Sequence, residues 1–376
     1  MGHLHLAKEE VYRALAGRLD KNPVGAPFSE TLMKILYCLY TTEEAEVGGS
    51  FPLQPVTLDR LVQATGIMEG DLLKHLNRMA DKGLVVDVER KGKTFYMLSP
   101  VIVGFFEYTF MRVNSKLPLK ELAELFEEYH NQPGVPEEFF GADTKVFQTW
   151  GYESLVPPDV KTEVMTFEKA SEMIRDSGGG ALSTCYCRHQ AYHLGRKCDA
   201  PMEDVCTSLG NAAGWLIKRG FARPASTDEL LRVLDRTEEL GLVHLADNVQ
   251  NNPAFMCHCC GCCCVALRGI NEHHVDTVHP SNFIPRIDVS KCTGCGLCVR
   301  RCHVRALDLL SGIPGAQKDK AVLLYEDKCL GCGACIPGCS QGAMTFNRRE
   351  KIRIPPLDKK DQMMRIAREK RKTAGP

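Results

Sequence analysis

An excess of charge of one sign is the first thing that this sequence lacks. Lys plus Arg and Asp plus Glu each total 47 among 376 residues, so the formal net charge is zero. A neutral chain produces no long-range field that would attract nucleic acid or an anionic membrane, so such a partner would need a local basic patch. Apolar runs of 18 residues are also absent. We therefore expect no membrane-spanning helix and no membrane partner.

Targeting and nucleotide-binding motifs are lacking as well. The first ten residues turn polar and charged too soon for a secretory signal peptide, and Leu6 stands where an N-myristoylation motif requires Ser or Thr. The glycine run at 178–180 is followed by neither a G-x-G-x-x-G pattern nor a P-loop lysine. No general base or nucleophile stands out. These absences predict a cytoplasmic protein without nicotinamide or flavin sites and without independent catalysis.

Cysteine, by contrast, is abundant, with 19 residues. The cysteines gather in C-x-C and C-x2-C runs, and without an export signal this pattern indicates metal binding in a reducing compartment rather than disulfide bonds. Exposed thiolates and iron–sulfur clusters are readily oxidised, so we expect the host to be an anaerobe or to live with little oxygen. The hydrophobic content of 44% is sufficient for folded domains with buried cores.

Two cysteine runs near the end of the chain repeat each other at a distance of 37 residues. Both have the spacing C-x2-C-x2-C-x3-C, with glycines that let the backbone approach the sulfur atoms. The pattern resembles the two-cluster bacterial ferredoxin module, which binds two [4Fe–4S] cubanes. Pairs of the C-x2-C type also occur in zinc ribbons, but the doubled pattern of eight cysteines favours iron–sulfur clusters.

The resemblance implies that the fourth cysteine of each run ligates the other cluster. His303 and Ser340 stand where the family usually has proline after that fourth cysteine, a departure that concerns local packing rather than ligation. The implied ligands of the first cluster are Cys292, Cys295, Cys298 and Cys339, and those of the second are Cys329, Cys332, Cys335 and Cys302.

Ten further cysteines lie in two runs in the central part of the chain. Side chains of neighbouring residues diverge, so the second run cannot direct all of its thiols at one cluster. We expect two sites, or one site that draws ligands from both runs; the first run is also sufficient for a [4Fe–4S] site by itself. The first run is Cys185, Cys187, Cys198 and Cys206, and the second is Cys257, Cys259, Cys260, Cys262, Cys263 and Cys264.

Three interpretations of this central block remain open. We expect one or two further iron–sulfur clusters; the alternatives are a structural zinc site assisted by His189 or His258, and buried thiols without metal. The block resembles the cysteine-rich blocks of uncharacterised multi-domain [4Fe–4S] proteins of anaerobes. Arg188, beside the first run, would tune a cluster's potential through its charge, or it would be an ordinary surface cation.

The N-terminal part predicts helices followed by a hairpin. Residues 57–66 and 68–82 predict two helices joined by a tight turn, and residues 83–98 predict two strands. This succession resembles a winged-helix domain of the MarR-like type, which implies DNA contacts from the second helix and the hairpin. Acidic residues dilute the basic patch, so docking or scaffolding is the preferred role and DNA binding the alternative. The candidate DNA-binding residues are Lys74, Asn77, Arg78, Arg90, Lys91 and Lys93.

Some expectations concern single segments. The apolar stretch 101–111 predicts a core helix, residues 160–165 predict a strand, and residues 203–218 predict another helix. The basic segment 347–376 predicts a solvated tail, with a docking strip for an acidic redox partner as the alternative.

Other expectations concern single residues. His130 is expected to be exposed at the end of a helix, near the negative pole of the helix dipole. Trp150 is expected to lie in a loop-rich linker, and Cys38 is expected to be a core thiol rather than a metal ligand.

Together these patterns predict an α+β multi-domain protein. It would comprise an N-terminal winged helix, a central α/β cysteine-rich domain and a C-terminal ferredoxin-like module with βαβ repeats and two [4Fe–4S] clusters. The expected divisions are a winged-helix domain with a leading helix at 1–115, a helical and loop linker at 116–159, the cysteine-rich domain at 160–280, the ferredoxin domain at 281–346 and the basic C-terminal tail at 347–376.

The predicted function is electron transfer through these clusters. We expect the chain to serve a redox partner, a flavin- or metal-containing oxidoreductase, as an electron-transfer component. One alternative is a redox-sensing transcription regulator that binds DNA through the winged helix. The other is an enzyme that reduces a thiol or disulfide substrate at an open central cluster.

Overall fold

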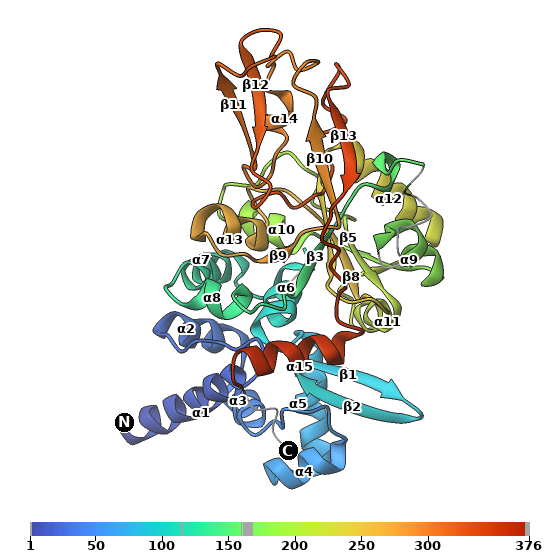
Figure 1. The fold of residues 1–376 in the computed structure, drawn as a ribbon. Coiled ribbons are helices and arrows are strands. Elements are labelled where there is room, and N and C mark those ends of the chain that lie inside the picture. The colour runs from blue at the N-terminus through green and yellow to red at the C-terminus, as the bar shows by residue number, and fades with distance from the viewer. Residues whose placement is uncertain (1, 114–115, 159, 161–167, 373–376) are drawn as a thin grey trace.

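The computed structural model describes residues 2–113, 116–158, 160 and 168–372. It is a mixed α/β structure of several parts: N-terminal helices, a central sheet, and a narrow lobe that projects from one end (Figure 1). Residues 161–165, most of the strand expected at 160–165, lie outside the described residues. No helix in the part of the chain that the structure describes is long and apolar enough to cross a membrane.

The N-terminal part is built mainly of helices with one buried face. In α2, for example, Leu32, Ile35, Leu36 and Leu39 are buried, and the Ser29 hydroxyl caps the helix by accepting from the Leu32 amide. The helices are α1 (Gly2–Asp20), α2 (Glu30–Leu39), α3 (Thr42–Gly49), α4 (Leu58–Thr65), α5 (Glu69–Asp81), α6 (Phe106–Phe110), α7 (Leu119–His130) and α8 (Val135–Phe140).

A hairpin of β1 (Val85–Arg90) and β2 (Lys93–Leu98) follows α5. Its two-residue turn places Lys91 and Gly92 at positive φ, as a tight antiparallel hairpin requires. Helix, turn, helix and hairpin thus occur in the order that the sequence predicts. That this part belongs to the winged-helix class stays a prediction.

Asp87 of β1 joins this hairpin to the central part of the chain. Its carboxylate accepts hydrogen bonds from Trp215 Nε1 at 2.9 Å, Lys218 Nζ at 2.7 Å and Arg219 Nη2 at 2.6 Å, all from or just beyond α11 (Gly210–Lys218). Arg219 also pairs with Asp81 of α5 at 2.8 Å. Because Asp87 is buried, these donors compensate its carboxylate for the loss of water.

The central part contains a seven-stranded sheet in the order β6-β4-β5-β8-β7-β3-β9. All neighbours are antiparallel except β3 and β9, which are parallel. The strands are β3 (Phe147–Trp150), β4 (Gly180–Ser183), β5 (Cys206–Leu209), β6 (Arg223–Ala225), β7 (Val243–Asp247), β8 (Phe255–Cys259) and β9 (Val278–His279).

Helices cover both faces of this sheet (Figure 1). One face packs against α9 (Ala170–Asp176) and α12 (Thr227–Glu239) in a common apolar core. The other face lies toward α6, α10 (Tyr186–His193) and α13 (Val265–His273). Since side chains alternate along a strand, Cys257 and Cys259 of β8 face the second set of helices, whereas Met256 and His258 face the first.

Two segment expectations are wrong in part. The helix expected at 203–218 begins only at Gly210; the residues before it form β5, which supplies Cys206 to the sheet. The stretch 101–111 is helical only in α6, because Ile102, Val103 and Gly104 have non-helical backbone angles. There the Glu107 carboxylate accepts from the Gly104 amide at 2.7 Å and the Val103 amide at 3.2 Å. Burial raises the pKa of Glu107 to about 8.

Two single-residue expectations are also wrong. His130 is 6% exposed and packs among Phe106, Phe126 and Phe139; neither ring nitrogen has a hydrogen-bond partner in the described chain. Burial lowers its pKa to about 3. Trp150 does not lie in a loop: it ends β3, a strand inside the sheet, and it is buried. In both cases tertiary packing, which has no local signature, decides the environment.

The projecting lobe contains two antiparallel strand pairs, β10 with β13 and β11 with β12. Its elements are β10 (Phe283–Ile287), α14 (Leu297–Arg300), β11 (Leu307–Ser311), β12 (Lys320–Leu324) and β13 (Met344–Arg348). The β10–β13 pair stands next to the central sheet and the β11–β12 pair lies farther along the lobe (Figure 1).

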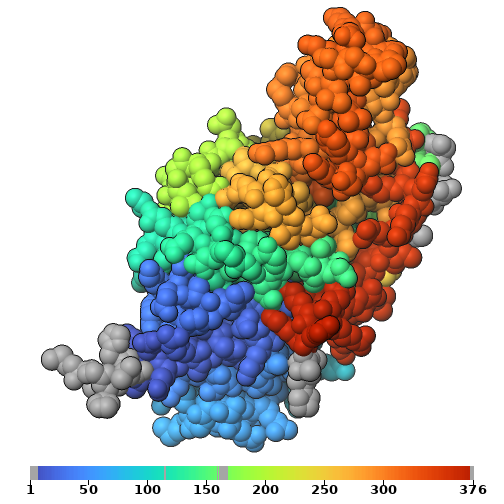
Figure 2. All heavy atoms as spheres, turned by 60° about the vertical axis from the view of Figure 1, so that its left-hand side comes forward, coloured from blue at the N-terminus to red at the C-terminus, as the bar shows by residue number. Residues whose placement is uncertain are grey.

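The C-terminal segment is not a solvated tail. Helix α15 (Lys359–Glu369) returns from the lobe and lies against the N-terminal helices (Figure 2). Gln362 and Ile366 are buried, and the Gln362 amide donates to the Val146 carbonyl at 3.0 Å. Beyond the helix, Lys372 pairs with Glu138 at 2.5 Å. Lys370 and Lys372 therefore serve internal contacts, since both pair with Glu138.

Candidate metal centres

The eight cysteines of the lobe form two groups of four. Each group lines its own cavity of about 20 Å³. The groups are the same as those that the resemblance to ferredoxins implies: the tip group comprises Cys292, Cys295, Cys298 and Cys339, and the inner group comprises Cys302, Cys329, Cys332 and Cys335.

Glycine is required at one point of the inner loop. Gly331 has a φ of 64°, and a Cβ there would lie 2.0 Å from the Phe283 carbonyl oxygen. The resulting close approach lets the Gly331 amide donate to Cys329 Sγ at 3.4 Å. The Ala306 amide donates to Cys302 Sγ at 3.2 Å in the same way. Such N–H···S contacts stabilise the negative charge of cluster thiolates.

The two groups differ in their surroundings. In the tip group Cys295 is exposed, whereas the inner group lies against the central part of the chain. There the Tyr152 amide donates to the Cys332 carbonyl at 3.1 Å, and Arg349 Nη2 donates to the Cys329 carbonyl at 2.7 Å. The inner group thus lies between the tip group and the central cysteines.

His303 connects the inner group to the central cysteines. It follows Cys302 directly, at the position where ferredoxins usually have proline. Its Nε2 lies 2.8 Å from the Gly241 carbonyl, so this nitrogen is the donor, and its Nδ1 accepts from the Gly261 amide at 3.0 Å. A Cβ on Gly261 would come within 2.2 Å of the His303 carbonyl oxygen, so the two backbones are in direct contact.

Four central cysteines converge beside Gly261. Their sulfur atoms all lie within 4.8 Å of one another, close enough to ligate one metal ion. Cys198 Sγ lies 3.6 Å from Cys260 Sγ and 3.7 Å from Cys263 Sγ. A hydrogen bond from the Cys263 thiol, with the positive charge of Arg188, lowers the pKa of Cys260 to about 3 despite burial. This four-cysteine group comprises Cys198, Cys260, Cys262 and Cys263.

The structure therefore divides the first cysteine run. A site made of Cys185, Cys187, Cys198 and Cys206 is wrong as a grouping, because Cys198 joins the second run while Cys187 and Cys206 contact other cysteines. The interpretation in which one site draws ligands from both runs describes the four-cysteine group.

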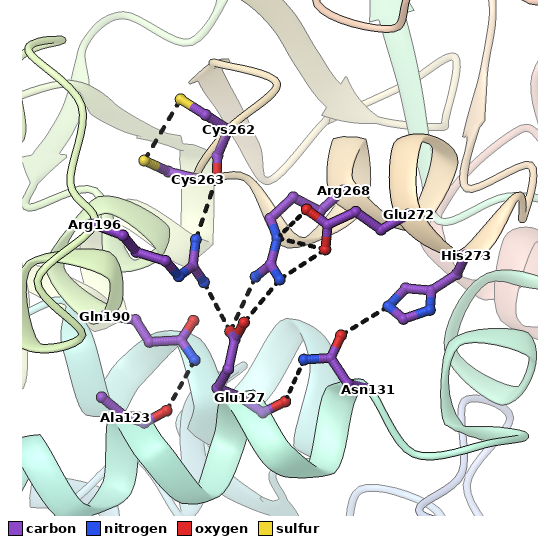
Figure 3. A network of polar contacts seen from close by, with 10 residues as sticks. All are labelled: Ala123, Glu127, Asn131, Gln190, Arg196, Cys262, Cys263, Arg268, Glu272 and His273. Atoms are coloured by element: carbon purple, nitrogen blue, oxygen red, sulfur yellow. Dashed lines mark hydrogen bonds and ion pairs between the residues drawn. The ribbon is translucent and has the colours of Figure 1, made fainter.

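Glu127 of α7 holds the loop of the four-cysteine group in place (Figure 3). Its carboxylate accepts two bonds from Arg268 of α13, at 2.7 and 2.9 Å, and one from Arg196 at 2.7 Å. Arg196 also donates to the Cys262 carbonyl at 3.2 Å. Bidentate arginine–carboxylate pairs fix orientation as well as distance, so the contact positions the loop relative to α7.

Five of the remaining central cysteines meet on the covered face of the sheet. Cys206 of β5 and Cys257 of β8 are directly opposite in the antiparallel register, and Cys259 follows two residues later on the same face. Their thiols contact one another, and those of Cys187 and Cys259 contact Cys264. This five-cysteine group comprises Cys187, Cys206, Cys257, Cys259 and Cys264, all buried.

Arg188 lies between the two central groups and is not a surface cation. It is 1% exposed, and its guanidinium donates to the Pro201 carbonyl at 2.9 Å and the His258 carbonyl at 2.8 Å. Burial disfavours its charge, but the nearby sulfur atoms of Cys185, Cys260 and Cys259 raise its pKa above the ordinary value. Cys185 lies in the same place, between the groups.

Neither histidine considered as a zinc ligand is directed at the cysteines. His258 points to the opposite face of the sheet, where Nδ1 lies 2.9 Å from the Thr237 hydroxyl and Nε2 lies 3.4 Å from that of Thr207. His189 contacts the Phe110 carbonyl at 2.8 Å and His193 at 3.2 Å. Any zinc site here would have to use cysteines alone.

All six candidate DNA-binding residues are exposed, and three of them also make contacts within the chain. Asn77 accepts a hydrogen bond from Arg219 at 3.3 Å, and Arg78 contacts His75 at 2.8 Å. Lys74 pairs with Asp71 at 2.8 Å. The hairpin residues Arg90, Lys91 and Lys93 are exposed. Cys38, outside all groups, is a half-buried thiol packed against the N-terminal core.

Comparison with known proteins assigns part of this arrangement. Residues 291–343 match the family model of a 4Fe-4S dicluster domain. The comparisons with curated proteins and with solved structures found no match. The matched range contains the tip and inner groups, so the chain is an iron–sulfur protein; the central groups lie outside it.

Proposed function

We propose that the chain is an electron-transfer protein with at least three iron–sulfur clusters. Two are [4Fe–4S] clusters in the tip and inner groups, and the third occupies the four-cysteine group. The single observation that carries this proposal is the contact of His303 with Gly261. It joins a residue adjacent to an inner-group cysteine to the loop that bears two cysteines of the central site.

The path from lobe to centre consists of backbone and one hydrogen bond. Cys302 belongs to the inner group and is bonded covalently to His303. The Gly261 amide donates to His303 Nδ1 at 3.0 Å, and Gly261 lies between Cys260 and Cys262. Asn271 adds a second tie by donating to the His303 carbonyl at 2.9 Å. No solvent layer separates the two sites along this route.

The outer end of the path is accessible to a partner. Cys295 of the tip group is exposed and lies in the projecting lobe, in the loop between β10 and α14. A flavin- or metal-containing oxidoreductase that docks on this lobe would exchange single electrons with the tip cluster. The inner cluster would pass them to the four-cysteine cluster.

The test separates transfer from cluster assembly. The anaerobically purified protein is mixed with a low-potential one-electron donor, and each cluster is followed by rapid-freeze EPR. We expect His303→Ala to slow reduction of the central cluster and to leave the ferredoxin pair and the iron content unchanged. His273→Ala is the matched control, because His273 contacts only Asn131 among the described residues. Equal rates in the two variants would contradict the route.

A separate measurement tests the third cluster. Replacing Cys262 by alanine removes one of its four thiolates, and we expect a loss of about four irons per chain. Unchanged iron, or zinc in place of iron, would leave only the ferredoxin pair for electron transfer.

DNA binding by the N-terminal part is a second candidate function. The exposure of Arg90, Lys91 and Lys93 at the hairpin favours it, because a wing reaches DNA through such residues. A regulator would show salt-dependent duplex binding that differs between the holo and apo protein. Identical binding of both forms, or none, would eliminate this candidate.

A further inference from the structure

Five thiols on the covered face of the sheet are not needed by the three clusters proposed above. They come from four elements or their ends: Cys187 from α10, Cys206 from β5, Cys257 and Cys259 from β8, and Cys264 from the start of α13. The fold, and not the spacing within either cysteine run, brings these five thiols to one place.

Buried inert thiols would not explain the surroundings of this group. Cys264 is the N-cap residue of α13, and Cys187 lines one cavity with Cys264, Val265 and Ala266, so both cysteines lie at the N-terminal end of this helix. Helix N-termini favour anionic partners, including thiolates. All five cysteines are free, so no disulfide uses them.

Arg188 gives a second, independent reason. A buried guanidinium requires anionic partners, because an isolated buried charge is very costly. In the described chain Arg188 forms no ion pair with a carboxylate, and its Nε has no hydrogen-bond partner. The groups near it that can carry negative charge are the thiols of Cys185, Cys259 and Cys260, which lie in or between the two central groups.

We propose that the five-cysteine group binds a fourth iron–sulfur cluster, with five thiolate ligands in place of the four that a cubane uses. The choice of iron rather than zinc rests on the proposed function, because the group lies beside the proposed electron path. The group is adjacent to the four-cysteine group, because Cys259 precedes Cys260 and Cys264 follows Cys263 in the chain, so it is the inner end of the same series of clusters.

The enclosure of the site limits what this cluster can do. Its cavity, of about 10 Å³, is lined by Phe106, Glu107, Phe147 and Tyr186 besides the cysteines. That space is about the size of one water molecule. Tyr186 Oη lies 4.0 Å from Cys257 Sγ. The walls leave no room for an organic substrate beside the cysteines, so the cluster would receive and hold electrons.

The test counts metals and ligands in the intact protein. Anaerobic native mass spectrometry of the full chain should show irons beyond the roughly twelve that three cubanes contain. Each of five single variants, Cys187→Ala, Cys206→Ala, Cys257→Ala, Cys259→Ala and Cys264→Ala, should lose these extra irons or change the ⁵⁷Fe Mössbauer spectrum. Cys38→Ala is the control.

Each other outcome would overturn the proposal. A wild-type total of about eight irons removes the fourth cluster, as does a total of about twelve that falls in the Cys262→Ala variant but in none of the five. If one of the five variants retains the iron content and the spectrum of the wild type, that cysteine is not a ligand and the cluster is a cubane with four thiolates. Zinc at this site would refute iron. The count is independent of the His303 experiment, so this proposal and the electron path fail separately.

Discussion

Asp87 holds the N-terminal hairpin against α11, and its replacement by asparagine should loosen that contact. The carboxylate is buried and accepts from Trp215, Lys218 and Arg219. Asparagine has nearly the same shape but no charge, so it imitates the protonated acid. The variant therefore isolates the contribution of the charge.

The size of the effect follows from the pKa of Asp87, which is lowered from 3.8 to about 2. Burial alone would raise this pKa, but the hydrogen bonds from Arg219, Lys218 and Trp215 outweigh it. The difference corresponds to roughly 2 kcal/mol in favour of the charged form, or about a 30-fold change in a local opening equilibrium. Since the folded-state pKa is depressed, this stabilisation is complete above about pH 4 and is lost as the pH falls toward 2.

Hydrogen exchange of the anaerobic holoprotein at neutral pH measures this opening. We expect faster exchange of amides in β1, β2 and α11 in Asp87→Asn and unchanged exchange in the lobe. Glu89→Gln is the matched control, because Glu89 lies on the same strand with an exposed side chain. If both variants exchange alike, the carboxylate does not hold the hairpin and the reasoning is refuted.

Three further predictions concern single positions. His130 is neutral in the folded protein, because burial lowers its pKa from 6.5 to about 3. Below pH 6.5 the free energy of unfolding of the wild type should therefore fall by up to about 1.4 kcal/mol per pH unit from this residue, and the melting temperature of His130→Phe should depend less on acid. Gly261→Ala places a Cβ 2.2 Å from the His303 carbonyl oxygen, so the free energy of local opening near His303 should fall by about 1–3 kcal/mol and hydrogen exchange there should become faster. Gly214→Ala is the control, because a Cβ at Gly214 would have no neighbour within 4 Å. Cys38→Ser should leave metal content unchanged, because this thiol lies outside every group; a loss of iron in elemental analysis would contradict the assignment of the clusters.

Local patterns predicted the elements that depend on local chemistry. Helices α4 (Leu58–Thr65) and α5 (Glu69–Asp81) lie within the two helical ranges predicted at 57–66 and 68–82, because their apolar residues recur at helical spacing. Glycine at 66 ends α4 with a φ of 69°, as expected of a helix stop. The tip and inner groups could be anticipated because their spacing and glycines are confined to short loops.

The central groups could not be predicted in this way. Cys206 meets Cys257 only because β5 and β8 pair in one register, and Cys198 meets Cys260 across the fold. The alternation of Cys257, His258 and Cys259 did hold a signal: in a strand it places both cysteines on one face and excludes the histidine. Burial of His130 and Arg188 is likewise a property of packing between distant segments.

The position of α15 has a consequence for how the protein is made. Domains tend to fold in the order of their synthesis, yet Gln362 of α15 donates to carbonyls of Val146 and Asn248, which are translated much earlier. Until α15 has left the ribosome, these carbonyls have no such donor. The lobe precedes α15 in the chain, so it is synthesised before this contact can form. Helix α15 therefore completes the central body only after the lobe has been made.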